Sequence, residues 1–357
     1  SRTRTKQKTI TRQFEVSKRA SLKILDVQLG KEEMNKKLVG LSMVRNESDI
    51  IETFIRHNLT LLNELHIVDH NSCDNTREIL TLLKQEGLPI HIYHYNELEY
   101  AQERIMNQMM QYILNNDANI DYIFPLDADE LIYCPSREIL HYFLSLIPQG
   151  RVGMYTWRGY LPNDTEYDPD FICYFTDQRK EEILTPKVII PRVIAETCRL
   201  TIGSHYMVNA EGKEIQSVVF IAPNSQNYYY WFIERFNAEF IETNDLWLGH
   251  YPIRSTAQQI KKVLEKSITM VMEKKGHKDI AWENQLRDLL AKKMSISLEA
   301  LRLIAYQYRS TTKEQTEIAN KQALRSQKLD LKYKHLISND PLPTIAKLVL
   351  ELADKLR

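Results

Sequence analysis

Two carboxylates with the spacing of a cation site follow an apolar run in residues 123–130, IFPLDADE, where Asp127 and Asp129 lie two positions apart. A carboxylate at the end of a buried strand is costly unless it is solvated, paired with an opposite charge or bound to a cation. Hard divalent ions such as Mg²⁺ and Mn²⁺ take oxygen ligands, commonly one or two carboxylates together with the phosphates of a substrate. The spacing therefore predicts a divalent cation site, with an ordinary acidic turn as the alternative.

Two further polar clusters also follow apolar runs. Arg45, Asn46 and Glu47 come directly after residues 38–44, and residues 69–74, DHNSCD, follow a second short run. In an open α/β sheet, ligands bind outside the carboxyl ends of the strands. If the apolar runs are parallel strands of one sheet, all three clusters lie along the same edge.

That arrangement requires helices between the strands. Apolar residues recur at helical spacing in residues 49–62 and 100–114, and a third helix is expected over 77–84. Further strands are expected at 90–95 and 122–126. The alternation of strand and helix predicts an α/β fold with a mostly parallel sheet and helices on both faces.

The second half of the chain has a less regular pattern. Its expected strands are residues 151–157, 187–194 and 218–222. From residue 257 to residue 308 the sequence predicts long helices with polar faces rich in Lys and Glu.

Composition argues against several classes of protein. Of the 357 residues 43% are hydrophobic and 26% charged, and 47 Lys and Arg balance 47 Asp and Glu. No apolar run approaches the ~20 residues that span a bilayer, and a net charge of zero provides no field to attract nucleic acid, so no nucleic-acid partner is expected. The GxGxxG and GxxxxGKS/T nucleotide motifs are both missing. Four cysteines without a CxxC pair favour a reducing, cytoplasmic location.

Taken together, the three polar clusters resemble the nucleotide-sugar-binding half of a GT-A-fold, family-2-like glycosyltransferase. The matching segments are VRNE at 44–47, VDHNSCDNT at 68–76 and LDADE at 126–130. Residues 249–255, GHYPIRS, resemble the His-Tyr-X-X-Arg-Ser segment of a bacterial branch of that group. The resemblance implies a GT-A fold, which is α/β and Rossmann-like with a mostly parallel central sheet, helices on both faces and a C-terminal helical extension.

The resemblance also divides the chain into regions. Residues 1–36 would be a basic N-terminal arm or linker, 37–255 a GT-A glycosyltransferase domain and 256–357 a C-terminal helical region. Within the domain, residues 37–130 would form the nucleotide-sugar half and 131–255 the acceptor half.

Single residues acquire expected roles from the same resemblance. The nucleotide-binding positions would be Arg45, Asn46, Glu47, Asp69 and Asn71. Arg104 would face the donor sugar and diphosphate, and Arg254 and Lys262 would neutralise the diphosphate leaving group. The metal, Mn²⁺ or Mg²⁺, would be held by Asp127, Asp129 and His250, and a UDP-sugar is the expected co-substrate.

The chemistry follows from where charge develops. A cation and an arginine beside the departing diphosphate stabilise its growing negative charge in place of protonation. An inverting enzyme also needs a general base for the acceptor hydroxyl. Inversion is favoured over retention, which stays an open alternative, and the base stays unassigned among Asp164, Asp168 and Glu211. His205 is expected as an acceptor-site group or as a substitute metal ligand.

The sequence thus predicts a metal-dependent glycosyltransferase that moves a sugar from a nucleotide-diphosphate donor to a hydroxyl of a glycan or lipid-linked acceptor in surface polysaccharide synthesis. A nucleotidyltransferase-like metal enzyme and an inactive sugar-nucleotide-binding scaffold are the alternatives. Basic helix faces could contact a partner domain or the inner face of the membrane, with a solvated face as the alternative. Their lysines are Lys261, Lys262, Lys266, Lys274, Lys275 and Lys278.

Overall fold

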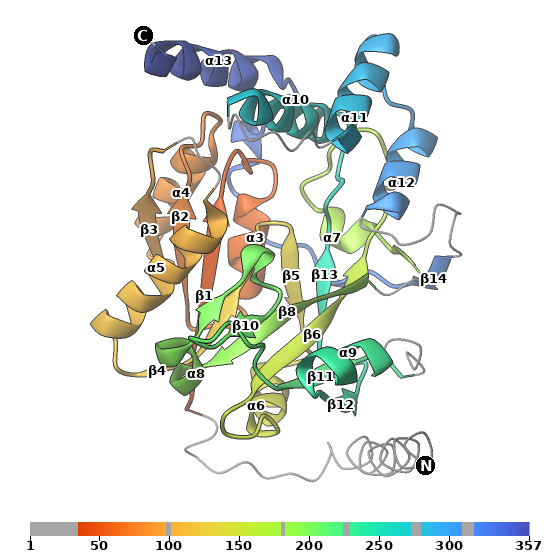
Figure 1. The fold of residues 1–357 in the computed structure, drawn as a ribbon. Coiled ribbons are helices and arrows are strands. Elements are labelled where there is room, and N and C mark those ends of the chain that lie inside the picture. The colour runs from red at the N-terminus through yellow and green to blue at the C-terminus, as the bar shows by residue number, and fades with distance from the viewer. Residues whose placement is uncertain are drawn as a thin grey trace.

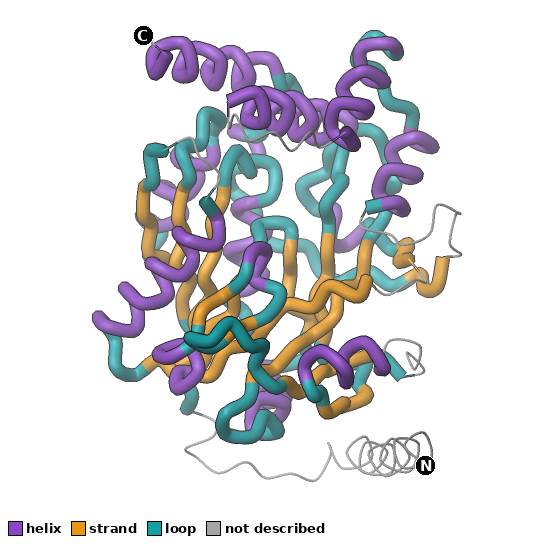
Figure 2. The backbone as a smooth tube through the Cα atoms, in the orientation of Figure 1, coloured by secondary structure: helices purple, strands orange, loops and turns teal. Residues whose placement is uncertain are grey.

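The computed structural model describes residues 35–97, 101–179, 183–223, 229–272, 280–308 and 318–356. The predicted basic arm, residues 1–36, lies outside these ranges except for its last two positions. A ten-stranded sheet runs through the middle of the molecule, with helices packed around it (Figures 1 and 2). Its main path follows the order β12-β11-β6-β8-β4-β1-β2-β3.

One half of this sheet is parallel. Its strands are β1 (Lys37–Val44), β2 (Glu64–Asp69), β3 (Ile90–His94) and β4 (Ile120–Pro125). β1 pairs with β2 on one side and with β4 on the other, and β2 pairs with β3. The strand order therefore reverses between β1 and β4, and the carboxyl ends of strands at such a switch point form the usual ligand site.

The other strands extend the same sheet. They are β5 (Glu130–Tyr133), β6 (Val152–Gly159), β8 (Ile183–Pro191), β11 (Ser217–Ile221), β12 (Glu239–Glu242) and β13 (Trp247–His250). β8 is antiparallel to both β4 and β6 and joins the two halves, whereas β11 is parallel to β6 and β12. β13 pairs in parallel with β6 and antiparallel with β5, which brings a late segment of the chain beside residue 130.

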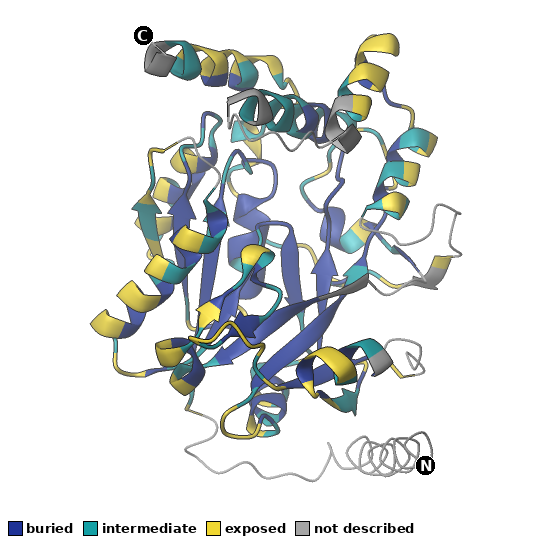
Figure 3. Ribbon diagram, in the orientation of Figure 1, coloured by how far each residue is buried: buried dark blue, intermediate teal, exposed yellow. Residues whose placement is uncertain are grey.

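Helices cover both faces. One face packs against α3 (Ile51–Asn58), α4 (Thr76–Gln85) and α6 (Arg137–Ser145), and the other against α5 (Gln102–Asn116), α8 (Arg192–Thr197) and α9 (Tyr229–Phe236). Side chains alternate between the faces along a strand, so Leu38 of β1 joins one core while Val39 and Leu41 join the other. In Figure 3 the central strands are mostly buried, β3 and β12 at the ends of the sheet are only partly buried, and the outward side of α5 is exposed.

The C-terminal region is mainly helical and lies beyond the loops that follow β1 and β2 (Figure 1). Its helices are α10 (Thr256–Met272), α11 (Ile280–Ala291), α12 (Leu298–Gln307) and α13 (Leu342–Leu356). Smaller elements are α7 (Phe171–Tyr174), β7 (Asp177–Arg179), β9 (Arg199–Leu200), η1 (Ile202–Ser204), β10 (Met207–Val208), β14 (Ile318–Lys321) and η3 (Lys334–Leu336). In the part of the chain that the structure describes, no helix has the length and hydropathy needed to cross a bilayer.

The predicted α/β fold, with a mostly parallel Rossmann-like sheet, helices on both faces and a C-terminal helical extension, is confirmed. The predicted strand 187–194 is wrong at its end, because β8 stops at Pro191 and α8 begins at Arg192. Arg192 pairs with Glu196 one turn later and donates to the carbonyl groups of Leu114 and Asp117 at the end of α5. These contacts favour a helix there over a continued strand.

Candidate functional site

The segment after β4 is organised by a buried lysine. Lys187 of β8 is completely buried, and its Nζ lies 2.8 Å from Asp127 Oδ2 and 3.2 Å from Glu130 Oε2. Gln102 Nε2 donates to Asp127 Oδ1 at 3.1 Å. Burial alone would lower the pKa of Lys187, but the Asp127 and Glu130 carboxylates outweigh it and raise that pKa. Both oxygens of Asp127 therefore have protein partners.

Asp129 faces a different group, the imidazole of His250. Antiparallel pairing of β13 with β5 sets His250 opposite Glu130, and the backbone N–H of Tyr251 donates to the carbonyl of Asp129 at 2.9 Å. This register places His250 Nε2 3.8 Å from Asp129 Oδ1, with both side chains largely buried. The separation exceeds a hydrogen bond, so the two groups face each other without a direct bond.

Burial keeps this imidazole neutral. It lowers the pKa of His250 to about 4, against the opposing effect of Asp129. Burial would raise the pKa of Asp129, but His250, Lys262 and Arg254, in that order, bring it below its ordinary value. His250 Nδ1 is buried and makes no hydrogen bond with any residue that the structure describes. At neutral pH the pair is a carboxylate facing a neutral imidazole, which is the form of each that binds metal.

A second carboxylate, Glu47, completes the acidic side of the site. Arg254 holds it, with Nη2 2.8 Å from Glu47 Oε2 and Nε 2.7 Å from Asp49 Oδ2, while Nη1 donates to the carbonyl of Tyr251 at 3.0 Å. Burial raises the pKa of Glu47 to about 7, with Arg254 opposing the rise and Asp49 and Asp129 adding to it. A bound cation would relieve the repulsion between Glu47 and Asp129.

The residues present therefore fit a divalent ion. Asp129 offers a carboxylate oxygen and His250 an imidazole nitrogen 3.8 Å away, a pair that suits Mn²⁺. Among the described residues no third carboxylate or imidazole atom lies within 4.8 Å of both, so phosphate oxygens of a substrate would complete the set. Asp127, whose oxygens face Lys187 and Gln102, is less available.

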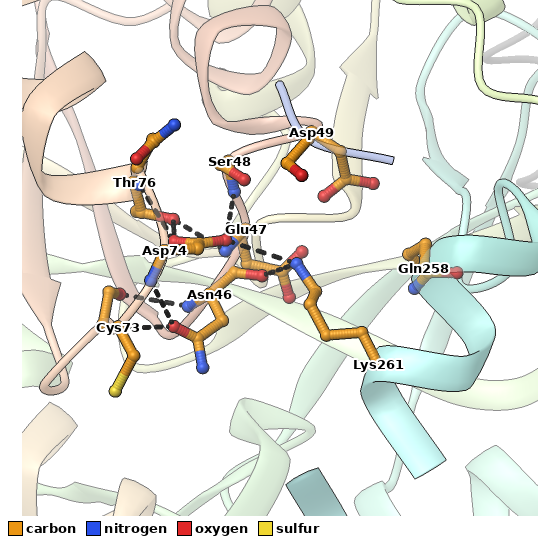
Figure 4. A network of polar contacts seen from close by, with 12 residues as sticks. Asn46, Glu47, Ser48, Asp49, Cys73, Asp74, Thr76, Gln258 and Lys261 are labelled. Atoms are coloured by element: carbon orange, nitrogen blue, oxygen red, sulfur yellow. Dashed lines mark hydrogen bonds and ion pairs between the residues drawn. The ribbon is translucent and has the colours of Figure 1, made fainter. Parts of the chain in front are cut away.

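The loop after β1 is tied to its neighbours by Asn46, as Figure 4 shows. Its Oδ1 accepts from the backbone N–H groups of Cys73 at 2.6 Å and Asp74 at 3.2 Å, and its Nδ2 donates to Glu265 Oε1 at 2.6 Å. Its backbone carbonyl accepts from Lys261, whose side chain extends from α10 toward this loop. The side chain of Asn46 thus joins the loop after β1 to the loop after β2 and to α10.

The two nucleotide candidates after β2 are also engaged. Asp69 is completely buried and accepts from Ser72 N at 3.1 Å and Arg77 Nε at 2.8 Å. Asn71 has a left-handed φ of 53° and donates to Glu351 of α13 at 2.7 Å. The helical region therefore lies directly over this loop.

The cationic candidates lie in three different settings. Arg104 is 46% exposed and contacts Tyr95 and Glu97, at the end of β3. Lys262 donates to the carbonyl of Pro252 at 3.2 Å and lowers the pKa of Asp129. Arg45 is half-buried, and its Nε makes no hydrogen bond within the described ranges. Of these three, Lys262 is the one whose charge lowers the pKa of Asp129.

His205 reaches the site through an aromatic ring. Trp157 stacks on His250 with ring centroids 4.1 Å apart and meets His205 edge-on at 5.7 Å. His205 Nδ1 lies 3.0 Å from the carbonyl of Pro186. The indole of Trp157 thus contacts both imidazoles.

The three candidates for the general base make local contacts. Asp164 accepts from the N–H of Thr165 at 2.6 Å, and Asp168 accepts from that of Asp170 at 2.9 Å. Glu211 is exposed and pairs with Lys213 at 2.8 Å. Their assignment stays a prediction.

Sequence reasoning missed Lys187, Asp49 and Gln102. A signal existed for Lys187, because a single lysine at an otherwise apolar strand must find a buried partner. The expected basic face is only partly a surface feature, because the amino groups of Lys261 and Lys262 turn toward the loops after β1 and β13. Lys274, Lys275 and Lys278 lie outside the described residues.

Comparison with known proteins gives likenesses among solved structures and none among family profiles or curated sequences. No protein-family profile matches the chain, and no curated protein sequence is significantly similar to it. The mannosyltransferase PcManGT from Pyrobaculum calidifontis, in complex with GDP-Man and Mn²⁺, aligns over 97% of this chain and 95% of its own, with 14% identity and a TM-score of 0.35. A likeness at that level carries no argument about the site or the activity of this chain.

Proposed function

We propose that the chain is a metal-dependent glycosyltransferase that transfers a sugar from a nucleoside-diphosphate donor to a hydroxyl group. The observation that carries the proposal is the buried Asp129 carboxylate, which faces the neutral imidazole of His250 across 3.8 Å at the carboxyl end of β4. Glu47 adds a second carboxylate from the end of β1. The sequence resemblance of these segments to family-2-like glycosyltransferases supplies the reaction class.

In this proposal Asp129 and His250 hold the cation, Glu47 adds negative charge near Asp129, and Asp127 is positioned by Lys187. A bound Mn²⁺ or Mg²⁺ would supply positive charge at the leaving diphosphate. Lys262 contributes a further positive charge beside Asp129, and Arg254 orients Glu47. A UDP-sugar donor, inversion at the anomeric carbon, and a glycan or lipid-linked acceptor in polysaccharide synthesis are the finer parts of the proposal.

The proposal divides the chain as the sequence does. Residues 37–130 would bind the donor and residues 131–255 would bind the acceptor. Residues 256–357 would form a helical region beside the donor-binding loops. The bond that forms joins the anomeric carbon to the acceptor oxygen, and the bond that breaks releases the nucleoside diphosphate. The acceptor proton passes to a base, for which Asp164, Asp168 and Glu211 remain the candidates.

The deciding experiment combines binding and turnover. Nucleotide sugars are screened by thermal shift with and without Mn²⁺, since a ligand of the native state raises the melting temperature. The ligands that bind are then incubated with hydroxyl acceptors, and released nucleoside diphosphate is measured in wild type and in Asp129→Asn. We expect Mn²⁺-dependent stabilisation and transfer, both lost in the variant.

Other outcomes select the alternatives. Release of pyrophosphate in place of nucleoside diphosphate would favour a nucleotidyltransferase-like enzyme. Donor binding without turnover, unchanged in Asp129→Asn, would favour a binding scaffold. Transfer that resists EDTA fully would reject the metal-dependent reaction.

A further inference from the structure

A second cluster of ligand-type side chains lies at the opposite ends of the strands from Asp129. Glu64 begins β2, His66 follows two residues later, and His91 lies on the neighbouring edge strand β3. Parallel pairing sets His66 directly opposite His91, and the two rings stack with centroids 4.4 Å apart. One ligand atom from each of the three residues lies within 4.8 Å of the others.

Both histidines lie near the carboxylate of Glu64. His66 Nε2 lies 3.0 Å from Glu64 Oε1, and His91 Nε2 lies 3.8 Å from Glu64 Oε2. Around a tetrahedral zinc ion with bonds near 2.0 Å, neighbouring ligand atoms are separated by about 3.3 Å. The two observed nitrogen–oxygen distances bracket that value. Because the two rings stack nearly parallel, the half-exposed His91 ring must turn for both nitrogens to point at one ion.

We propose that Glu64, His66 and His91 form a zinc-type transition-metal site that links the edge strand β3 to β2. Two imidazoles and one carboxylate are a common zinc ligand set with an open fourth position. The exposed fraction of the His91 side chain, 49%, gives the ion access from solvent. The two imidazole ligands also give this site a different metal preference from the site at Asp129, because Mg²⁺ prefers oxygen ligands.

The hydroxyl group of Tyr93 allows His66 to change its tautomer when a metal ion binds. Its hydroxyl lies 2.9 Å from His66 Nδ1, on the other side of the ring from Glu64. A hydroxyl both donates and accepts. Without metal, His66 Nε2–H donates to Glu64 and Nδ1 accepts from Tyr93; with metal, Nδ1–H donates to Tyr93 and Nε2 carries its lone pair to the ion. The imidazole keeps one proton throughout, and its tautomer changes.

Lys37 is the competing cation. Its Nζ lies 2.9 Å from Glu64 Oε2, but it also contacts Asp117. Lys37 therefore keeps an anionic partner when Glu64 turns toward a metal ion.

The test measures Zn²⁺ affinity of the full chain, after removal of metal, by competition with a chromophoric chelator. His91→Asn removes a ligand at an exposed position, and His94→Asn is the matched control, on the same strand with 47% of its side chain exposed. We expect His91→Asn to lower the affinity for one equivalent of Zn²⁺ by more than about a hundredfold, and Tyr93→Phe to lower it by about tenfold. His94→Asn should leave this affinity unchanged. Excess Mg²⁺ should not displace this zinc.

Three results would overturn the proposal. They are wild-type protein that binds zinc no more tightly than His91→Asn, an equal loss in His94→Asn, and displacement by Mg²⁺. Circular dichroism of each variant confirms that the fold is retained. The outcome is independent of the proposed transfer reaction, because the readout is zinc affinity and the Asp129 site is intact in every variant.

Discussion

Lys187 Nζ and Asp127 Oδ2 are 2.8 Å apart at the junction of the two halves of the sheet, and the lysine side chain is inaccessible to solvent. β8 supplies the lysine, and the segment after β4 supplies the carboxylate. The ion pair therefore fixes the direction of the segment that carries Asp129. A strand of the second half orients the candidate cation ligand of the first half.

Replacing this lysine should destabilise the protein strongly. Lys187→Met removes the charge at similar volume and leaves Asp127 and Glu130 without their shared cation. Breaking a buried pair by removing one partner costs about 3 kcal/mol or more in the free energy of unfolding. Urea unfolding measures it. Lys213→Met, which breaks the exposed pair with Glu211, is the control and should leave stability nearly unchanged. Equal effects of the two substitutions would contradict the buried role of Lys187.

Removing the metal should lower thermal stability, and Asp129 should account for the effect. We expect Mn²⁺ to raise the melting temperature of EDTA-treated protein and Asp129→Asn to abolish the rise, because it removes a carboxylate ligand. Asp121→Asn changes the same residue type within β4, beside Lys36, and should respond like wild type. His250→Gln should reduce Mn²⁺ affinity by more than about tenfold in a calorimetric titration. A wild-type titration for His250→Gln would remove that histidine from the site.

The hydrogen bond between Asn46 and Glu265 of α10 should make the effects of substitutions at the two positions on the free energy of unfolding non-additive. Asn46→Asp replaces the Nδ2 donor with an oxygen 2.6 Å from Glu265 Oε1, and we expect a loss of about 2 kcal/mol in the free energy of unfolding. Adding Glu265→Gln restores a donor and should recover most of the loss. Hydrogen exchange of α10 should rise in the single variant and fall back in the double variant. No recovery would mean that the two side chains are not coupled.

Acid sensitivity should depend on His57. Burial lowers the pKa of this histidine to about 4, with the charge of Arg325 acting in the same direction and the Ile132 carbonyl opposing. The pKa of His57 in the folded protein lies below the unfolded value of 6.5. The stabilisation contributed by neutral His57 is therefore complete above pH 6.5 and is lost as the pH falls toward 4. The full effect is about 3 kcal/mol. His57→Gln should flatten the pH dependence of urea unfolding between about pH 7 and about pH 4. An unchanged slope would show that His57 does not control it.

The sequence could predict the elements that bring three polar clusters together, because strand and helix periodicity is a local property. Parallel strands then place Glu47, Asp69 and Asp129 at one edge of the sheet. It could not predict the register of β13, a four-residue strand that sets His250 beside Asp129, since so short a segment has little periodic signal. Lys187 had a local signal as a lysine in a largely apolar strand, but the sequence could not predict its partners, which lie 57 and 60 residues earlier in the chain. Its importance depends on the antiparallel position of β8.

The contacts of α10 and α13 bear on how the chain can be shortened. A protein ending at residue 255 would lack Lys261 and Glu265, which meet Asn46, and Glu351, which meets Asn71. The loops after β1 and β2 would then lose these protein partners, and water would have to replace them. The first 255 residues are thus poorly suited to expression as an independent fragment, because trimming from the C-terminus would remove the contacts that hold the loops after β1 and β2.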